Sequence, residues 1–232
     1  MLRHFENNNF MQYFLQFLKK IRGLREIKRQ GVLYYGVKEK NVDSASDHTF
    51  RLTLMVWLLG HGKRINLSKA MKLALVHDLC KVYTGDITPY QGLFSKADTK
   101  HRLAWRWRRL SLTEKQKRYK KRFQTEQAAI EKLTGKLAPG MRKDILDAWA
   151  DYQKMESPEA KFVVQVDRAE NLLEAFEQFE ENHNFPTQPW WEHADEVVHD
   201  RGILDLMEGI SKEELRIVKE SRRKKGGEKK QK

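Results

Sequence analysis

Four polar side chains occur where the surrounding sequence is apolar and helical in pattern. His77 and Asp78 directly follow the apolar run Leu-Ala-Leu-Val, and Asp167 follows the run Phe-Val-Val-Gln-Val. His48 stands in the first turn of a third apolar segment. A carboxylate buried alone costs several kcal/mol, so it must be paired, protonated or bound to a cation. These four residues are therefore candidates for a shared cation site.

Two imidazoles and two carboxylates form a mixed nitrogen and oxygen ligand set. Such a set suits one divalent transition metal, Mn, Co, Fe, Ni or Zn, better than it suits Ca. A metal held in this way can polarise a phosphoryl oxygen and lower the pKa of its bound water toward about 7. The alternative for each residue taken singly is a satisfied core or capping position. The pair His199-Asp200 illustrates that alternative, because it follows an acidic stretch without an apolar lead-in, and we interpret it as a solvated helix face.

Four short motifs carry a family resemblance through their order along the chain. They are Ser-Asp-His at 46–48, Leu-Val-His-Asp at 75–78, Thr-Gly-Asp-Ile at 84–87, and Glu-Ala-Lys-Phe at 159–162, which leads to Asp167. In this order the motifs resemble those of the HD-domain metal-dependent phosphohydrolases, and the 5′-deoxynucleotidase branch is the most similar. The resemblance extends from about Arg29 to Glu180 and is interrupted by a basic segment at about 91–122.

The resemblance implies an all-α HD-domain helical bundle that is often dimeric. It also implies release of phosphate from deoxynucleoside 5′-monophosphates, with a small nucleotide as the substrate. By the same resemblance, Asp86 lies by the sugar and Arg29, ahead of the first histidine, contacts the substrate. The implied ligands of the one divalent metal are His48, His77, Asp78 and Asp167.

The sequence departs from the family pattern at Lys81. Relatives usually carry a glutamate three residues after the aspartate of the His-Asp pair, where it positions or activates the attacking water. Lys81 lies three residues after Asp78, hence on the same helix face as the ligands. An ammonium accepts no proton unless its pKa is strongly lowered, but it can hold a phosphate or compensate anionic ligands. The alternative is a lysine that points to solvent.

A second departure from the family pattern is Val32, where relatives tend to have tryptophan. It weakens the assignment of Arg29, whose alternative role is a surface charge.

Helices must position these residues, because apolar residues recur at spacings of three and four and strand-like alternation is scarce. We expect a loop at 31–45 and another at 182–191. Phe50, Leu54, Trp57 and Leu58 are predicted to face inward from the helix that follows Ser46. The predicted helices cover 8–25, 46–59, 68–85, 124–135 and 139–154, and a long one begins at Pro158.

Composition indicates one domain over 1–215 and a disordered basic tail at 216–232. The chain has 232 residues, 40% of them apolar, which is enough for one sizeable core. It has no membrane span and no signal-like N-terminus. Its single cysteine, Cys80, forms no internal disulfide, so a cytoplasmic location is the default prediction.

The formal charge of +13 is concentrated in basic segments. Residues 91–122 hold twelve Lys/Arg against two Asp/Glu, together with Trp105 and Trp107. This segment can grip a phosphate backbone and stack on bases, or it can be a solvated insertion, and we expect weak polyanion binding at most. The N-terminal helix can lie on a membrane surface or pack on the bundle, and we favour packing.

Three functions remain in competition. The first is a metal-dependent phosphomonoesterase that hydrolyses nucleoside, most simply deoxynucleoside, 5′-monophosphates, slowed by the loss of the glutamate. The second is a catalytically weakened module that binds nucleotide or metal, and Lys81 separates it from the first. The third is a nucleic-acid-associated protein that uses the basic insertion.

Overall fold

The computed structural model describes residues 8–93, 106 and 109–228, and Trp105 and Trp107 lie outside these described residues. The described residues are helical, apart from turns and an isolated bridge between Lys28 and Ser44. The predicted all-α class is therefore confirmed. The chain divides into two compact units, Met1–Val163 and Val164–Lys232. In the part of the chain that the structure describes, no helix is both long enough and apolar enough to cross a membrane.

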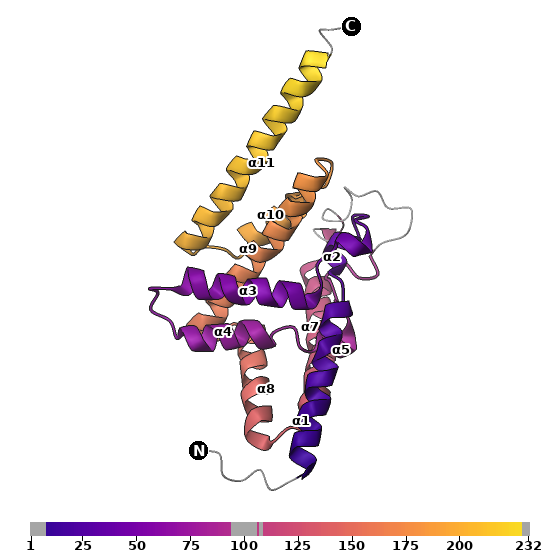
Figure 1. Ribbon diagram of the computed structural model, residues 1–232, viewed down its shortest axis with the longest axis vertical. Coiled ribbons are helices and arrows are strands. Elements are labelled where there is room, and N and C mark those ends of the chain that lie inside the picture. Colours follow the sequence, from indigo (N-terminus) through magenta and orange to yellow (C-terminus); the bar gives the residue numbers. More distant parts are fainter. Residues whose placement is uncertain (1–7, 94–105, 107–108, 229–232) are drawn as a thin grey trace. The chain divides into compact units, whose positions relative to one another are not determined.

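The first unit gathers most of the helices around one core (Figure 1). Within it, α3 packs on α4, α4 on α8, and α7 on α5, α8 and α1. Its large buried side chains include Leu52, Leu73, Ile130 and Trp149. The elements are α1 (Asn8–Ile21), η1 (Arg22–Glu26), α2 (Gln30–Leu33), η2 (Glu39–Asn41), α3 (Ala45–Gly60), α4 (Leu67–Val76), α5 (Lys81–Thr84), α7 (Leu112–Thr134), α8 (Pro139–Lys154) and the start of α9 (Pro158–Glu181).

Helix α3 begins one turn ahead of His48 at a capping box. The Ser44 hydroxyl accepts from the Asp47 amide at 3.2 Å, and the Asp47 carboxylate accepts from the Ser44 amide at 2.8 Å. These reciprocal bonds satisfy two amides that the helix itself leaves without partners. The cap is thus Ser44 and not Ser46, and the first turn of α3 has a fixed geometry.

The prediction of which face of α3 is buried was wrong. Phe50 and Leu58 are 73% and 61% exposed, and Leu54 and Trp57 are exposed as well. The buried row is Ala45, His48, Leu52, Val56 and Gly60. Because α3 is apolar on two sides, periodicity alone does not select the core face, and the row that packs on α4 is the one carrying His48.

The predicted helix over 68–85 is two helices with a turn between them. Helix α4 begins after Asn66, whose side chain accepts from the Lys69 amide at 3.0 Å, and it ends at Val76. Residues 77–80 form turns, and α5 then runs to Gly85, which ends it with φ of +69° as a glycine can. His77 and Asp78 therefore lie at a break between helices and not in the middle of one.

The basic segment 91–122 is not a separate insertion over its full length. Helix α7 begins at Leu112, where the Ser111 hydroxyl accepts from the Glu114 amide at 3.1 Å. Lysine and arginine are strong helix formers, and Arg118 adds an ion pair with Glu114 one turn earlier at 3.2 Å. Residues 112–122 thus form the first half of a long helix, which sequence periodicity placed from 124 onward. Residues 31–45 likewise contain two short helices, α2 and η2.

The second unit contains most of α9 together with α10 (Gln188–Asp195) and α11 (Arg201–Glu228). The Gln165 side chain on α9 accepts from the amides of His199 and Asp200 at 2.8 Å each. The Glu214 carboxylate on α11 accepts from the Thr187 hydroxyl, just ahead of α10, at 2.6 Å. It also accepts from the Trp191 indole N–H, within α10, at 3.0 Å. These buried or half-buried contacts connect the three helices of this unit. Part of the predicted loop at 182–191 is thus the start of α10.

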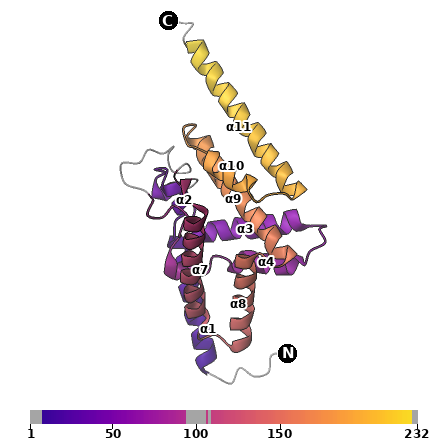
Figure 2. The ribbon, with the colours of Figure 1, turned by 180° about the vertical axis from the view of Figure 1, so that it is seen from behind.

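The C-terminal end also differs from its prediction. The tail at 216–232 was expected to be disordered, but α11 continues to Glu228. Lysine, arginine and glutamate favour helix, and Arg216 pairs with Glu220 at 2.8 Å and also with Glu213. Figure 2 shows this helix extending beyond the end of α9 and α10 within its unit.

Replacing Ser44 by Ala should lower the free energy of unfolding by about 1 kcal/mol, because the α3 cap is lost. Ser46→Ala is the matched control, since Ser46 lies within the helix and should change stability by less than about 0.5 kcal/mol. Urea unfolding followed by circular dichroism measures both values. An equal effect of the two substitutions would contradict the assigned cap.

Candidate metal centre

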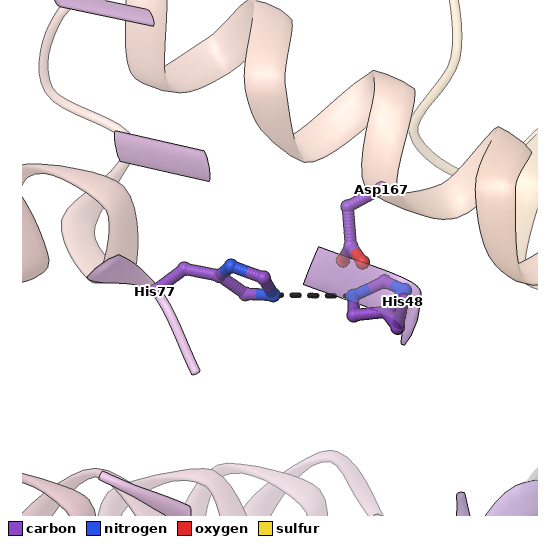
Figure 3. A group of neighbouring side chains, drawn as sticks. All are labelled: His48, His77 and Asp167. Atoms are coloured by element: carbon purple, nitrogen blue, oxygen red, sulfur yellow. Dashed lines mark hydrogen bonds between the residues drawn. The ribbon is translucent and has the colours of Figure 1, made fainter. Parts of the chain in front are cut away.

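His48 and His77 point one imidazole nitrogen each toward the other inside the first unit. Both rings are buried, and their Nε2 atoms lie 3.2 Å apart (Figure 3). The Nδ1 atom of His77 lies 2.7 Å from the Ala74 carbonyl oxygen, which can only accept a hydrogen bond. That contact places the Nδ1 proton of His77 and leaves its Nε2 lone pair directed at His48, as a metal-ligating histidine requires.

Asp167 lies on α9 and belongs, with His48 and His77, to a group of side chains that could hold a metal ion. One ligand atom from each of His48, His77 and Asp167 lies within 4.8 Å of the others (Figure 3). Asp167 is oriented by its own helix, because Arg168 and Asn171 donate to its two carboxylate oxygens at 2.7 and 2.9 Å. Such outer partners fix the direction of a ligating carboxylate.

Asp78 lies beside both histidines but is also held by a cation. Its Oδ2 atom is 3.3 Å from Nε2 of His77 and 3.9 Å from Nε2 of His48. The same oxygen lies 2.7 Å from Nζ of Lys81. Lys81 extends to a second carboxylate, with its Nζ 2.6 Å from Oδ1 of Asp86. Lys81 is 8% exposed, so it does not point to solvent.

Arg29 completes this charged cluster because the chain returns to the start of α3. The Arg29 amide donates to the Asp43 carbonyl at 3.1 Å, and the Ala45 amide donates to the Ile27 carbonyl at 2.8 Å. Arg29 is buried, with Nη1 3.9 Å from the Asp78 carboxylate, and so is not a surface charge. Next to it, the Gln30 amide donates to Asp86 at 2.7 Å.

The charges of the cluster support one another. Burial acts to lower the pKa of Lys81, but the carboxylates of Asp78 and Asp86 outweigh it and hold that pKa above its ordinary 10.5. Burial acts to raise the pKa of Asp86, but Lys81 and Arg29 outweigh it and hold that pKa below 3.8. Asp78 has its pKa held well below 3.8 against burial, chiefly by His77 and Lys81. Lys81 is therefore a charged ammonium between two carboxylates at neutral pH.

Sequence reasoning missed Glu126, a buried carboxylate on α7. It lies 3.7 Å from Arg122 and accepts from Gln153 at 3.4 Å. Burial raises its pKa above 4.5, and the charges of Asp78 and Asp86 add to that rise, so Glu126 senses the cluster electrostatically. The available signal was periodicity, because Glu126 stands one turn before the buried pair Ala129-Ile130.

The second His-Asp pair has a structural role. His199 is exposed, and its amide and that of Asp200 donate to Gln165. Asp200 accepts from the amides of Gly202 and Ile203 at 3.0 and 3.4 Å and so caps α11. The pair lies in the turn before α11 and not on a helix face.

Comparison with known proteins places the chain in a family. The model of the family described as HD domain matches residues 21–200, which is most of the chain. The zebrafish (Danio rerio) protein 5′-deoxynucleotidase HDDC2 is 32% identical over 210 residues, covering 90% of this chain and 91% of the relative. The protein therefore belongs to the HD domain family.

Other relatives and solved structures agree. Human 5′-deoxynucleotidase HDDC2 is 31% identical and covers 70% of this chain and 67% of its own. A crystal structure from Pyrococcus horikoshii has a TM-score of 0.62 at 22% identity and covers 85% of this chain and 98% of its own. A predicted metal-dependent phosphohydrolase from Magnetospirillum magnetotacticum has a TM-score of 0.60 at 18% identity, covering 90% and 97%. These structures support the fold.

Replacing Lys81 by Met should lower the free energy of unfolding of the metal-free protein by about 3–5 kcal/mol, because two buried carboxylates lose their cation. The native pKa of Asp86 is lowered, so its pairing stabilises the fold above pH 3.8 and is lost as the pH falls through the native pKa. The deficit of the variant should therefore shrink in acid. Unfolding by urea at several pH values measures it.

The exposed residue Lys40 provides the control, since Lys40→Met removes a lysine from the surface. It should change stability by less than about 0.5 kcal/mol. A Lys81→Met protein as stable as the native one at pH 7 would contradict the buried ion-pair cluster.

Proposed function

We propose that this protein hydrolyses deoxynucleoside 5′-monophosphates to nucleoside and phosphate at one divalent transition metal. The reaction class, metal-dependent phosphohydrolysis, follows from the family and from relatives named 5′-deoxynucleotidase. The substrate and the site residues are the proposal. The observation that carries it is the buried pair of imidazole nitrogens, 3.2 Å apart, with a carboxylate of Asp167 in the same group.

The donor set fits a metal. His77 Nε2 is left as an acceptor by its contact with the Ala74 carbonyl oxygen, and Asp167 is oriented by Arg168 and Asn171. The ligands we propose are His48, His77, Asp78 and Asp167, and the set suits Mn, Co, Fe, Ni or Zn. When bound, such a metal supplies Lewis-acid polarisation of the phosphoryl group and activation of water.

The other side chains of the cluster bind and orient the substrate. Arg29 and Lys81 are buried cations beside Asp78, and both can donate to the oxygens of a phosphate dianion. Asp86 is held in place by the Gln30 amide and Lys81, and its carboxylate can accept from a sugar hydroxyl. Because all of these groups are fixed by other contacts, the site needs little rearrangement to orient a nucleotide.

Lys81 makes the enzyme slow in this proposal. An ammonium with a raised pKa accepts no proton from water, so the base that relatives have at this position is absent. Its charge also lies 2.7 Å from the proposed ligand Asp78, where it opposes metal binding. The competing function, a nucleotide- or metal-binding module, follows if both effects together abolish turnover.

We also propose that the protein forms a homodimer through the exposed face of α3. That face is lined by Phe50, Leu54, Trp57 and Leu58. Their exposed fractions are 73%, 40%, 49% and 61%. Rows of exposed apolar residues of this size are uncommon on monomers.

A cytoplasmic location remains a prediction that rests on the single buried cysteine, Cys80.

Weak polyanion binding is a further proposal for the basic segment. Of its described residues, 112–122 lie on α7, where Arg118 and Lys121 line a cavity of about 440 Å³ with Thr88 and Tyr119. Two of the neighbouring cations are engaged by acids of the same helix, Arg118 by Glu114 and Arg122 by Glu126. Partial neutralisation of this kind favours weak, salt-sensitive binding.

The metal proposal is tested by replacing Asp167 with Ala. At a free metal concentration about 100 times Kd, bound metal should stabilise the native protein by about 2.7 kcal/mol. Asp167→Ala should lose the bound metal, which elemental analysis measures. It should also lose the metal-dependent stabilisation, which is measured as a rise in melting temperature when metal is added. Asp195→Ala, at an exposed carboxylate of α10, should retain both. Retained metal in Asp167→Ala would contradict the proposed ligand set.

The role of position 81 is tested by Lys81→Glu. With metal present to compensate the added carboxylate, the variant should bind metal more tightly and raise phosphate release from deoxynucleoside monophosphates by at least about tenfold. General-base help is typically worth about 10²–10⁴-fold. Lys40→Glu makes the same charge reversal at an exposed site and should change neither value. Unchanged metal affinity and rate in Lys81→Glu would remove residue 81 from the site. An absence of phosphate release from both proteins, with metal bound, would favour the binding module.

A further inference from the structure

Helix α1 exposes an apolar stripe that its own packing does not cover. The side chains of Phe10, Phe14, Phe17 and Ile21 are half-buried where α1 packs on α7 and η1. Beside them, Met11, Leu15 and Leu18 are 56%, 51% and 42% exposed. Their spacings of four and three place these three residues in one row along the helix. The apolar arc of α1 is thus wider than the contact that anchors it.

The same stripe ends in cations. Lys19 lies four residues after Leu15, and Arg22 lies four residues after Leu18, so both continue the exposed side of the helix. Both are exposed, and α1 itself contains no aspartate or glutamate. Lys20 also lies in the last turn of α1. The exposed side therefore combines an apolar row with a positive end.

Lysines near α1 contact two tyrosine rings. Lys136 lies 5.3 Å from the ring centroid of Tyr13. Lys20 and Lys132 both lie 4.5 Å from the ring centroid of Tyr83. These contacts hold three ammonium groups next to the helix within the first unit. The first unit therefore places further positive charge beside α1.

We infer that α1 docks the protein onto an anionic phospholipid surface. The apolar row lies among the acyl chains at the interface, and Lys19 and Arg22 lie at the lipid phosphates. A helix of 14 residues is about 21 Å long, and its charged side keeps it in the plane of the interface. This docking is a property additional to the proposed hydrolase activity.

Charge selects this occupant over a second copy of the chain. Two α1 helices packed in parallel would bring Lys19, Lys20 and Arg22 of each copy together, and an antiparallel pair would place them against a helix that contains no aspartate or glutamate. Anionic lipid offers the opposite charge, and each lysine or arginine near the surface adds to the attraction. The exposed face of α3 is different, since its apolar row ends in neither lysine nor arginine.

The test is sedimentation of the full-length protein with vesicles of neutral lipid alone and with about 30% anionic phosphatidylserine. The protein should bind the anionic vesicles, and high salt should release it because exposed charges are screened. Leu15→Glu should lower the vesicle partition coefficient at least tenfold. Leu215→Glu, the same change at a leucine of α11 that is 55% exposed, should leave it unchanged.

A second pair of variants tests the charges. The double variant Lys19→Gln, Arg22→Gln should weaken binding, whereas Lys38→Gln, Lys40→Gln removes two exposed cations elsewhere and should not. Phosphate release from free nucleotide should be the same in Leu15→Glu and the native protein, so this test stands apart from the proposed function. Circular dichroism establishes that each variant is folded.

Three results would overturn the inference. The first is equal binding to neutral and anionic vesicles or no binding to either. The second is equal loss in Leu15→Glu and Leu215→Glu, or loss only in the Lys38→Gln, Lys40→Gln variant. The third is a change of oligomeric state in Leu15→Glu, measured by light scattering, with vesicle binding intact, which would assign the stripe to a contact between copies.

Discussion

The ammonium of Lys81 is the charge on which the buried cluster of the first unit depends. It lies 2.7 and 2.6 Å from the carboxylates of Asp78 and Asp86, and all three groups are shielded from water. Two carboxylates in such a place would repel each other and resist burial. With Lys81 and the nearby Arg29, the four charges sum to zero, so the cluster is neutral before any metal arrives.

The local backbone is arranged to bring these groups together. The turn at 77–80 ends α4 at Val76 and starts α5 at Lys81, which brings Lys81 into contact with both Asp78 and Asp86. Gly85, at φ of +69°, reverses the chain so that Asp86 faces back. The bridge between Lys28 and Ser44 places Arg29 beside the start of α3, where the capping box fixes His48 one turn later. The electrostatics of the site thus depend on helix ends, where backbone geometry is most closely determined by caps and turns.

The sequence predicts the helices and the burial of the candidate ligands better than it predicts faces and boundaries. His77, Asp78 and Asp167 were recognisable because charged groups next to apolar runs need a partner. The core face of α3 was not, because two apolar rows compete and only tertiary packing on α4 selects the one that carries His48. The start of α7 was missed because its first half has almost no apolar residues and is helical by propensity and ion pairs. Glu126 was missed for a related reason, since its surroundings depend on the packing of α7 on α8, where Gln153 donates to it.

A neutral cluster changes how a metal and a phosphate would bind. In the proposed site a divalent cation adds two positive charges next to Lys81 and Arg29, and the negative charge of Asp167 is already shared with Arg168. A phosphate dianion supplies the remaining compensation. Metal and phosphate then each improve the binding of the other. The free energy of binding both together is more favourable than the sum of the free energies of binding each alone. A glutamate at position 81 would instead attract the metal by itself and leave the phosphate with a weaker cationic partner. Lysine at this position therefore shifts the electrostatic preference of the site from the metal toward the anionic substrate.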